Sequence, residues 1–365
     1  MKPFFSIIIP CCDVENYVRE CLDSVLGQAF QNWECLAGVE TSKDKTEEIV
    51  RDYAARDARI RVFNAERSGS CSATRNTGTE MAQGEYVIFL DSDDTIAENS
   101  LETLFRKISE RPGADLYPCA IKAYEENTGK CEIRDNYTDK SPAEMSGLEA
   151  TMEIDRLWGG TFCPMLQLTV FRREFLMEHN LRCIYGLRRQ DSEFSPRALY
   201  LAKRVVPLHE QFYLYRIRNN SVSTGARGPG YFHKDWAIIT ESLLAFYGKV
   251  SAEPGFDRRI GACWWRQWGP RFLYFWFSPQ NMRSIPRKQR AETLDRLFEN
   301  GFDQFDSLLQ YAPRHSRLVG PWVHVFVRHP SMRWLAELVF RGYFFLTRLR
   351  NRSRASFRSP APDRR

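Results

Sequence analysis

The stretch "VIFLDSDDTI", residues 87–96, joins an apolar run directly to a cluster of carboxylates. Its first four residues are β-branched, aromatic or aliphatic, and such an unbroken run predicts a strand that is buried on both faces of a sheet. Asp91, Asp93 and Asp94 follow within four positions, where like charges repel unless a positive group lies among them. A cation, from the protein or from solution, is therefore expected beside these carboxylates.

Strand-like and helix-like segments alternate over the first 115 residues. Apolar runs predict strands at 4–10, 33–39, 59–65 and 85–90, and amphipathic spacing predicts helices at 14–28, 45–57 and 68–84. Gly84 is expected to end the third helix in the left-handed conformation that glycine adopts readily. Alternation of this kind predicts a mostly parallel sheet joined by right-handed crossovers.

Polar and acidic loops follow three of these strands, at residues 10–15, 40–44 and 91–94. The carboxyl ends of parallel strands lie at one edge of a sheet, and the ligands of such sheets bind beyond that edge. The three loops are therefore expected to converge on one crevice, although they are distant in sequence.

The pattern is less regular beyond residue 115. A helix is expected at 99–111, a strand at 114–125 and a further strand within 166–176. From about residue 231 the sequence is helical in pattern and rich in aromatic residues. No apolar run approaches the roughly 20 residues that a membrane-spanning helix needs.

The positive charge of the chain is concentrated at its end. Residues 312–365 carry twelve arginines against Glu337 and Asp363, or +10, so the net charge of +6 leaves 6 − 10 = −4 for the rest. Trp, Phe and Leu alternate with these arginines, which predicts a helix that lies in the interface of an anionic membrane. The alternative is a helical cap with a solvated basic end. No nucleic-acid recognition motif is present.

The ten cysteines form no Cys-x-x-Cys pair, so a structural zinc site is not predicted. The apolar run at the N-terminus reaches Pro10 after a few positions and is too short for the core of a signal peptide. We therefore expect a cytoplasmic protein whose thiols are small core residues.

The Asp-x-Asp at the end of the strand suits a hard divalent cation. Mg²⁺ and Mn²⁺ prefer carboxylate oxygens and keep open positions for phosphate. Neither a Gly-x-Gly-x-x-Gly motif nor a P-loop is present, so a metal bridge would hold the phosphates of a nucleotide. The alternative is a solvated turn, but Arg75 on the preceding helix and the apolar strand both favour a site.

Two segments carry a resemblance to a known family. They are "SIIIPCCDVENYVRECLDSVLGQAFQNWE" (6–34) and "GSCSATRNTGTEMAQGEYVIFLDSDD" (69–94). In this order and spacing they resemble the family 2 glycosyltransferases, which are inverting enzymes of the GT-A fold. These enzymes move a sugar from a nucleoside diphosphate to an acceptor hydroxyl. The resemblance is strong over residues 4–105 and extends to about 224.

The resemblance implies roles for individual residues. The ligands that it implies for Mn²⁺ or Mg²⁺ are Asp91, Asp93 and Asp94. The residues assigned to the donor are Pro10, Asp13, Glu15, Glu40, Arg75 and Asp91. Arg216, Arg218 and Ser221 are placed where they reach donor phosphates, with an edge strand bearing solvated arginines as the alternative.

Asp191 is the residue that the resemblance offers as catalytic base. Relatives carry a Glu-Asp pair here, and this chain has Gln190 followed by Asp191. An inverting transfer needs a carboxylate within hydrogen-bond reach of the acceptor hydroxyl, on the face opposite the leaving diphosphate. The alternative for Asp191 is an N-cap or first-turn residue of the helix that begins there.

Several positions depart from the family pattern. Asp13 stands where relatives usually have Asn, Val39 and Glu40 replace a pair of aspartates, and Gln190 replaces Glu. The second of those aspartates contacts the nucleotide base in relatives, and Glu40 keeps its charge with one more methylene. These departures support a second hypothesis, a non-catalytic subunit that binds a nucleotide-sugar or a partner enzyme.

The resemblance leads to a full expectation for the chain. Residues 1–225 form a mostly parallel α/β domain of the GT-A type, with a nucleotide-binding half at about 1–115 and an acceptor half at about 116–225. Residues 226–350 form a helical extension, and 351–365 a disordered basic tail.

The expected activity is transfer of a single hexose or N-acetylhexosamine from a nucleoside-diphosphate sugar, most simply a UDP-sugar. The acceptor is a hydroxyl of a cell-surface glycan or of its lipid-linked precursor. Processive relatives carry transmembrane helices and a Gln-x-x-Arg-Trp motif, neither of which occurs in the sequence. We expect the protein on the inner face of the cytoplasmic membrane, as a peripheral protein.

Overall fold

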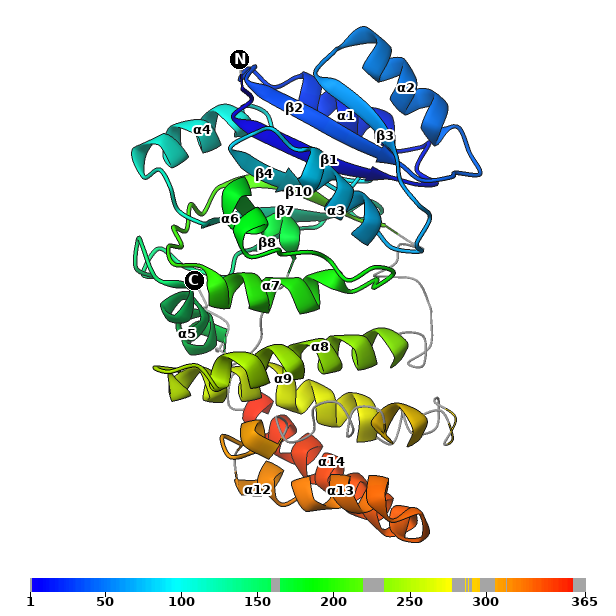
Figure 1. Ribbon diagram of the computed structural model, residues 1–365, viewed down its shortest axis with the longest axis vertical. Helices are drawn as coiled ribbons and strands as arrows, with labels where there is room; N and C mark the ends of the chain where they lie inside the picture. Colours follow the sequence, from blue (N-terminus) through cyan, green and yellow to red (C-terminus); the bar gives the residue numbers. More distant parts are fainter. Residues whose placement is uncertain are drawn as a thin grey trace, which may run out of the picture. The chain divides into compact units, whose positions relative to one another are not determined.

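The computed structural model describes residues 2–158, 165–218, 233–277, 286, 288, 291–295, 306–312 and 314–356. The chain divides into two compact units, Met1–Ala226 and Arg227–Arg365. The first unit combines sheets and helices, and the described part of the second is helical (Figure 1).

A central sheet of six strands runs through the described part of the first unit, in the order β3-β2-β1-β4-β9-β6. The strands are β1 (Phe5–Cys11), β2 (Trp33–Val39), β3 (Ile60–Asn64), β4 (Tyr86–Phe89), β6 (Leu116–Pro118) and β9 (Thr169–Arg172). The first four are parallel, and β9 is antiparallel to both of its neighbours. The predicted α/β class with a mostly parallel sheet is confirmed.

A smaller sheet has the order β5-β10-β7-β8, with β5 (Thr95–Ile96), β7 (Ala120–Glu125), β8 (Cys131–Arg134) and β10 (Gln211–Ile217). The prediction of one strand over 114–125 is wrong, because β6 and β7 belong to different sheets. The backbone N–H of Cys119 donates to Leu168 O, whereas that of Ala120 donates to Glu210 O. The chain therefore changes sheets between two consecutive residues.

Helices cover both faces of the central sheet. They are α1 (Val18–Leu26), α2 (Thr46–Arg56), α3 (Ser72–Met81), α4 (Ser100–Glu110), α5 (Gly147–Trp158), α6 (Arg173–Glu178) and α7 (Gln190–Leu201), with a short 3₁₀ helix at Leu166–Leu168. Ile7 and Ile9 pack with α1, α2 and α4, whereas Ile8 packs toward α5, α6 and α7. Successive strand residues point to opposite faces, so this apolar run fills two cores at once.

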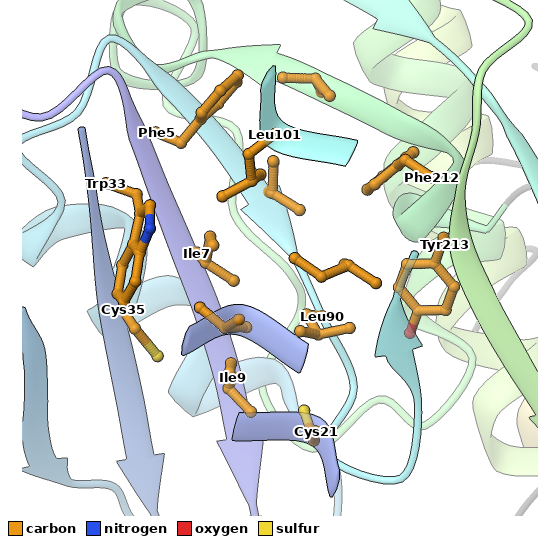
Figure 2. Close-up of a cluster of buried hydrophobic side chains, with 14 of the residues drawn as sticks. Phe5, Ile7, Ile9, Cys21, Trp33, Cys35, Leu90, Leu101, Phe212 and Tyr213 are labelled. Atoms are coloured by element: carbon orange, nitrogen blue, oxygen red, sulfur yellow. The ribbon is translucent and has the colours of Figure 1, made fainter. Parts of the chain in front are cut away.

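Figure 2 shows the first of these cores: Phe5, Ile7 and Ile9 lie along β1, and Leu90 lies between them and Tyr213 of β10. The ring of Tyr213 is fully buried there. This core therefore joins the central sheet to β10, which carries Arg216 and is followed directly by Arg218.

Helix α3 approaches the sheet closely because glycines stand at the contact. A Cβ atom on Gly38 of β2 would lie 2.2 Å from Cγ2 of Thr74 and 2.6 Å from Cζ of Phe63. A Cβ on Gly78 of α3 would lie 2.6 Å from Cγ2 of Ile8. The helix that bears Arg75 is thereby held against β1 and β2.

Gly38→Ala is accordingly expected to lower the free energy of unfolding by about 1–3 kcal/mol, because side chains must shift to accept the methyl group. Gly342→Ala is the control, since a Cβ there would meet nothing within 4 Å. Urea denaturation measures both variants. Equal stability of the two variants would contradict the close contact.

Two local predictions are wrong. Gly84 does not cap α3 in the left-handed conformation: the helix ends at Met81, and a Cβ on Gly84 would lie 2.6 Å from the backbone nitrogen of Ser6. Close packing therefore explains this glycine. Strand β1 also continues through Pro10 to Cys11. Proline has no backbone N–H to donate to a neighbouring strand. Pro10 is tolerated because β4 pairs with β1 only as far as Ile8, so no hydrogen bond to β4 is needed at this position.

The second unit has an aromatic core. Its described helices are α8 (His233–Ser251), α9 (Arg258–Phe277), α12 (Arg314–Arg317), α13 (Gly320–Arg328) and α14 (Arg333–Ser356), with a 3₁₀ turn at Pro330–Met332. Phe277, Phe326 and Phe340 from three helices pack together and are buried. In the ranges that the structure describes, no helix is long and apolar enough to cross a membrane. Residues 351–356 belong to α14, and the rest of the predicted tail lies outside the described residues.

Candidate functional site

Two of the predicted loops are tied together at the carboxyl edge of the sheet. Asp13 has a positive φ of 52°, and its carboxylate accepts a hydrogen bond from the backbone of Lys43 at 2.7 Å. The same carboxylate pairs with Arg67 at 2.6 Å. The Lys43 N–H, followed by Arg67, holds the pKa of Asp13 below its usual range. The charged side chain of Asp13 therefore links the loop after β1 to the loop after β2.

Glu15 adds two further hydrogen bonds between the same two loops. Its backbone N–H donates to Asp44 at 2.9 Å, and its carboxylate accepts from the backbone of Lys45 at 3.0 Å. Pro10 is buried near the end of β1, opposite Gly38 of β2. These contacts fix the shape of the rim between β1 and β2.

Glu40 lies at the carboxyl end of β2 and is almost completely buried, with 5% of its surface exposed. Thr74 of α3 donates to its carboxylate at 3.5 Å, and burial raises the pKa of Glu40. Val39 beside it is part of the hydrophobic core. Val39 and Glu40, which both depart from the family pattern, thus have different roles. Glu40 keeps a carboxylate at this edge of the sheet, whereas Val39 packs in the hydrophobic core.

The positive partner of Asp91 is Arg75. Its guanidinium approaches one carboxylate oxygen of Asp91 at 2.5 Å, and Gln167 donates to the other oxygen at 2.5 Å. Burial alone disfavours the charge of Arg75, but the negative groups around it, Asp91 foremost, together raise the pKa of the guanidinium. Among the described residues, Nε of Arg75 and Oε1 of Gln167 are buried without a hydrogen-bond partner.

Asp94 faces inward and holds β10. Its carboxylate accepts from the hydroxyl of Tyr213 at 2.6 Å and from the backbone N–H of Arg216 at 2.7 Å, and it is 1% exposed. Burial, with the charges of Asp93 and Asp91, raises its pKa well above the usual range. In this arrangement Asp94 joins the acidic loop to the second sheet.

Asp93 is paired with Arg218 of the same chain. The guanidinium of Arg218 donates from Nε at 3.0 Å and from Nη2 at 2.9 Å to one carboxylate oxygen of Asp93. Burial raises the pKa of Asp93, the charge of Asp91 adds to this, and Arg218 opposes it. Part of the acidic cluster is therefore balanced by an arginine that lies 125 positions further along the chain.

Arg216 is buried rather than solvated. Its Nε donates to the backbone oxygen of Asp93 at 3.0 Å, and its other nitrogens pair with Glu20 and Glu126. The alternative of an edge strand with solvated arginines is wrong, because β10 lies between β5 and β7 and Arg216 is 9% exposed. Ser221 lies outside the described residues.

Asp191 lies in the first turn of α7, which begins at Gln190. Its carboxylate accepts from the backbone of Ser192 at 2.9 Å, and its residue is partly exposed. Burial raises its pKa, Arg75 lowers it, and the charge of Asp91 raises it further. Asp191 is thus close enough to the Arg75–Asp91 pair to respond to both charges.

The acidic cluster can hold a divalent cation through one residue. Both oxygens of Asp91 and of Asp94 bond to other groups of the protein. Within the described ranges, the second oxygen of Asp93 bonds to no other residue, and no group of three or more His, Cys, Asp or Glu is arranged to bind a metal. Mg²⁺ commonly binds through one or two carboxylates and completes its shell with phosphates and water, which fits Asp93.

Sequence reasoning missed three residues of this site. Arg67 is the partner of Asp13, Gln167 of Asp91 and Tyr213 of Asp94. Arg67 precedes α3 in a polar loop and could have been proposed from its charge. Gln167 and Tyr213 stand in apolar segments, where no sequence pattern separates them from core residues.

The sequence of the chain is similar to curated glycosyltransferases. Residues 6–179 match the model of "Glycosyl transferase family 2". Glycosyltransferase GlyA of Streptococcus pneumoniae is 32% identical over 221 residues, which are 60% of this chain and 31% of GlyA. The minor teichoic acid biosynthesis protein GgaB of Bacillus subtilis is 30% identical over 137 residues, or 37% of this chain and 15% of GgaB. The chain thus matches less than a third of either relative.

The fold is also similar to a solved structure. Residues 1–349 of S. aureus TarS, in complex with UDP-GlcNAc, superpose with a TM-score of 0.66 at 19% identity, covering 96% of this chain and 92% of that one. This similarity shows the GT-A fold. The match of residues 6–179 to the family model and this fold both support a glycosyltransferase of family 2.

Proposed function

We propose that the protein is an inverting glycosyltransferase. It transfers a single hexose or N-acetylhexosamine from a nucleoside-diphosphate sugar to a hydroxyl of a cell-surface glycan or of its lipid-linked precursor. The observation that carries this proposal is the placement of Asp191 at the start of α7, within electrostatic reach of Arg75 and Asp91 at the carboxyl end of β4. Two relatives support this proposal: GlyA is a glycosyltransferase, and GgaB is a minor teichoic acid biosynthesis protein.

We assign the donor side to the edge formed by β1, β2 and β4. Glu40 offers a buried carboxylate to an N–H group of the nucleotide base, and Asp13 with Glu15 fixes the neighbouring loops. Arg75 Nε and Gln167 Oε1 are a buried donor and a buried acceptor without partners among the described residues, which hydroxyl groups of a sugar would satisfy. A UDP-sugar is the donor we favour, as in the UDP-GlcNAc complex of TarS.

In the proposed reaction Asp191 takes the proton of the acceptor hydroxyl as its oxygen bonds to the anomeric carbon. The bond from that carbon to the donor phosphate breaks, and the nucleoside diphosphate leaves with the electron pair. Arg218 lies where it can stabilise negative charge beside Asp93. A Mn²⁺ or Mg²⁺ ion bound at Asp93 would supply further stabilisation of the charge that develops on the diphosphate.

Asp93→Asn tests the assignment of the cation. The variant is expected to lose the Mn²⁺-dependent part of UDP binding, about tenfold or more in the dissociation constant, because a neutral amide is a poor ligand for a hard cation. Isothermal titration of UDP with and without Mn²⁺ measures it. Asp139→Asn, at an exposed aspartate, is the control. An unchanged Mn²⁺ dependence would contradict the role of Asp93.

A non-catalytic nucleotide-sugar-binding subunit is the second candidate. It is favoured by Val39, which is a core residue, and by Gln190 in place of an acidic residue. Incubation with UDP-, GDP- and dTDP-sugars, with and without Mn²⁺, separates the candidates through release of nucleoside diphosphate. Turnover with any donor supports the enzyme, whereas donor binding without turnover toward any acceptor supports the subunit.

An acceptor carried on a lipid requires the protein to reach a membrane. We propose that it acts as a peripheral protein on the inner, cytoplasmic face of the cytoplasmic membrane. The excess of arginine in residues 312–365 supports this location, since anionic lipids attract basic segments.

A further inference from the structure

Helix α14 of the second unit has apolar residues on two opposite faces. On one face, Ala336 and Phe340 are buried, and the ring of Phe340 lies 4.1 Å from that of Phe277. On the other face, Trp334, Leu338 and Phe345 are 59%, 53% and 63% exposed. A helix that is apolar on both sides is ordinarily buried on both sides. We therefore expect a binding partner to cover the exposed apolar face of α14.

The exposed residues form one continuous stripe, which we call the α14 stripe: Trp334, Leu338, Arg341 and Phe345. Leu338, Arg341 and Phe345 follow Trp334 by four, seven and eleven positions, which with 3.6 residues per turn places them on one side of the helix. Met332, 42% exposed, precedes the stripe in the 3₁₀ turn. The stripe therefore presents bulky apolar side chains with a cation among them.

The charge of the segment that contains the stripe indicates an anionic partner. The segment 312–365 has a net charge of +10, and Arg341 is exposed within the stripe itself. Trp and Phe partition into the interfacial layer of a bilayer, and arginine pairs with lipid phosphates at that depth. We propose that the α14 stripe is a docking surface for an anionic lipid membrane, on which the helix lies parallel to the bilayer plane.

A second copy of the chain fits the same surface less well. Two copies would bring two segments of charge +10 together, which opposes association. Three large side chains also offer roughly 300–400 Å² of apolar area, whereas a standard interface buries about 800 Å² on each partner. An anionic bilayer satisfies both the charge and the apolar side chains.

The test is co-sedimentation of the full chain with vesicles. Binding is expected to vesicles of phosphatidylcholine with 30% phosphatidylglycerol, to be at least about tenfold weaker with phosphatidylcholine alone, and to weaken as salt rises from about 0.1 to 1 M. The combined change Trp334→Gln, Leu338→Gln and Phe345→Gln is expected to reduce partitioning at least about tenfold, since it removes the apolar contribution. Glutamine is used because it preserves helix propensity.

Ile133→Gln is the matched control for Leu338→Gln, because Ile133 of the first unit is 58% exposed and Leu338 is 53% exposed. Full binding by the triple variant, or equal binding to neutral and anionic vesicles, would overturn the proposal. A third outcome would also overturn it: the wild type does not bind vesicles but forms an oligomer, and the triple variant does not form this oligomer. That result would identify a second copy of the chain as the partner. Light scattering supplies that measurement. Neither readout depends on glycosyl transfer.

Discussion

Asp191→Asn is expected to lower kcat by about 10²–10⁴-fold, which is the contribution typical of a positioned general base. The dissociation constant of UDP is expected to stay within about threefold of the wild type, because Asn has the size of Asp and its Oδ1 can still accept from the backbone of Ser192. Steady-state rates of UDP release and titration of UDP measure the two quantities. The split between them separates loss of a base from loss of the fold.

The pH dependence of the wild type follows from the same residue. Burial raises the pKa of Asp191 above its ordinary value, and only the deprotonated form accepts a proton from the acceptor. Activity should therefore fall as the pH decreases through this raised pKa, and should be retained above it. The acid limb of the profile should be absent from the residual activity of Asp191→Asn. Asp139→Asn should keep both the rate and the profile, and a similar loss there would contradict the assignment.

Arg75→Met is expected to lower the free energy of unfolding by about 3 kcal/mol. It leaves the carboxylate of Asp91 without its cation, and breaking a buried pair costs about 3–5 kcal/mol. The lower end applies because the side chain of Asp91 is 25% exposed while that of Arg75 is 5% exposed. Urea denaturation measures the change.

The double variant Arg75→Met with Asp91→Asn is expected to recover part of this loss, because the charge left unpaired is then removed. Arg56→Met is the control: its pair with Asp52 is exposed, at 67% and 43%, and its loss should cost less than about 1 kcal/mol. If Arg75→Met were no more destabilising than Arg56→Met, the pair would not hold the acidic loop in place.

Much of the architecture could be predicted from local patterns. The apolar runs that become β1, β2 and β4 and the amphipathic spacing of α1 and α2 were sufficient for the strands, the helices and the parallel core. The change of sheets at Cys119 could not be predicted, because it depends on Leu168 and Glu210, which lie far along the chain. The close contact of Gly84 with Ser6 also has no signal in the surrounding sequence.

The candidate site, like the fold, was predictable only in part from the sequence. The sequence alone determined that three carboxylates follow a buried strand and need positive charge beside them, because the repulsion of neighbouring like charges is a local property. The sequence already indicated Arg75 near this loop, but only the tertiary structure decided the pairing: Arg75 with Asp91, and Arg218 with Asp93. Several other arginines have the same charge, and which of them reaches the loop depends on how the chain returns through β10 and α3. Chain crossings of this kind are set by the packing of whole elements, which no short stretch of sequence encodes.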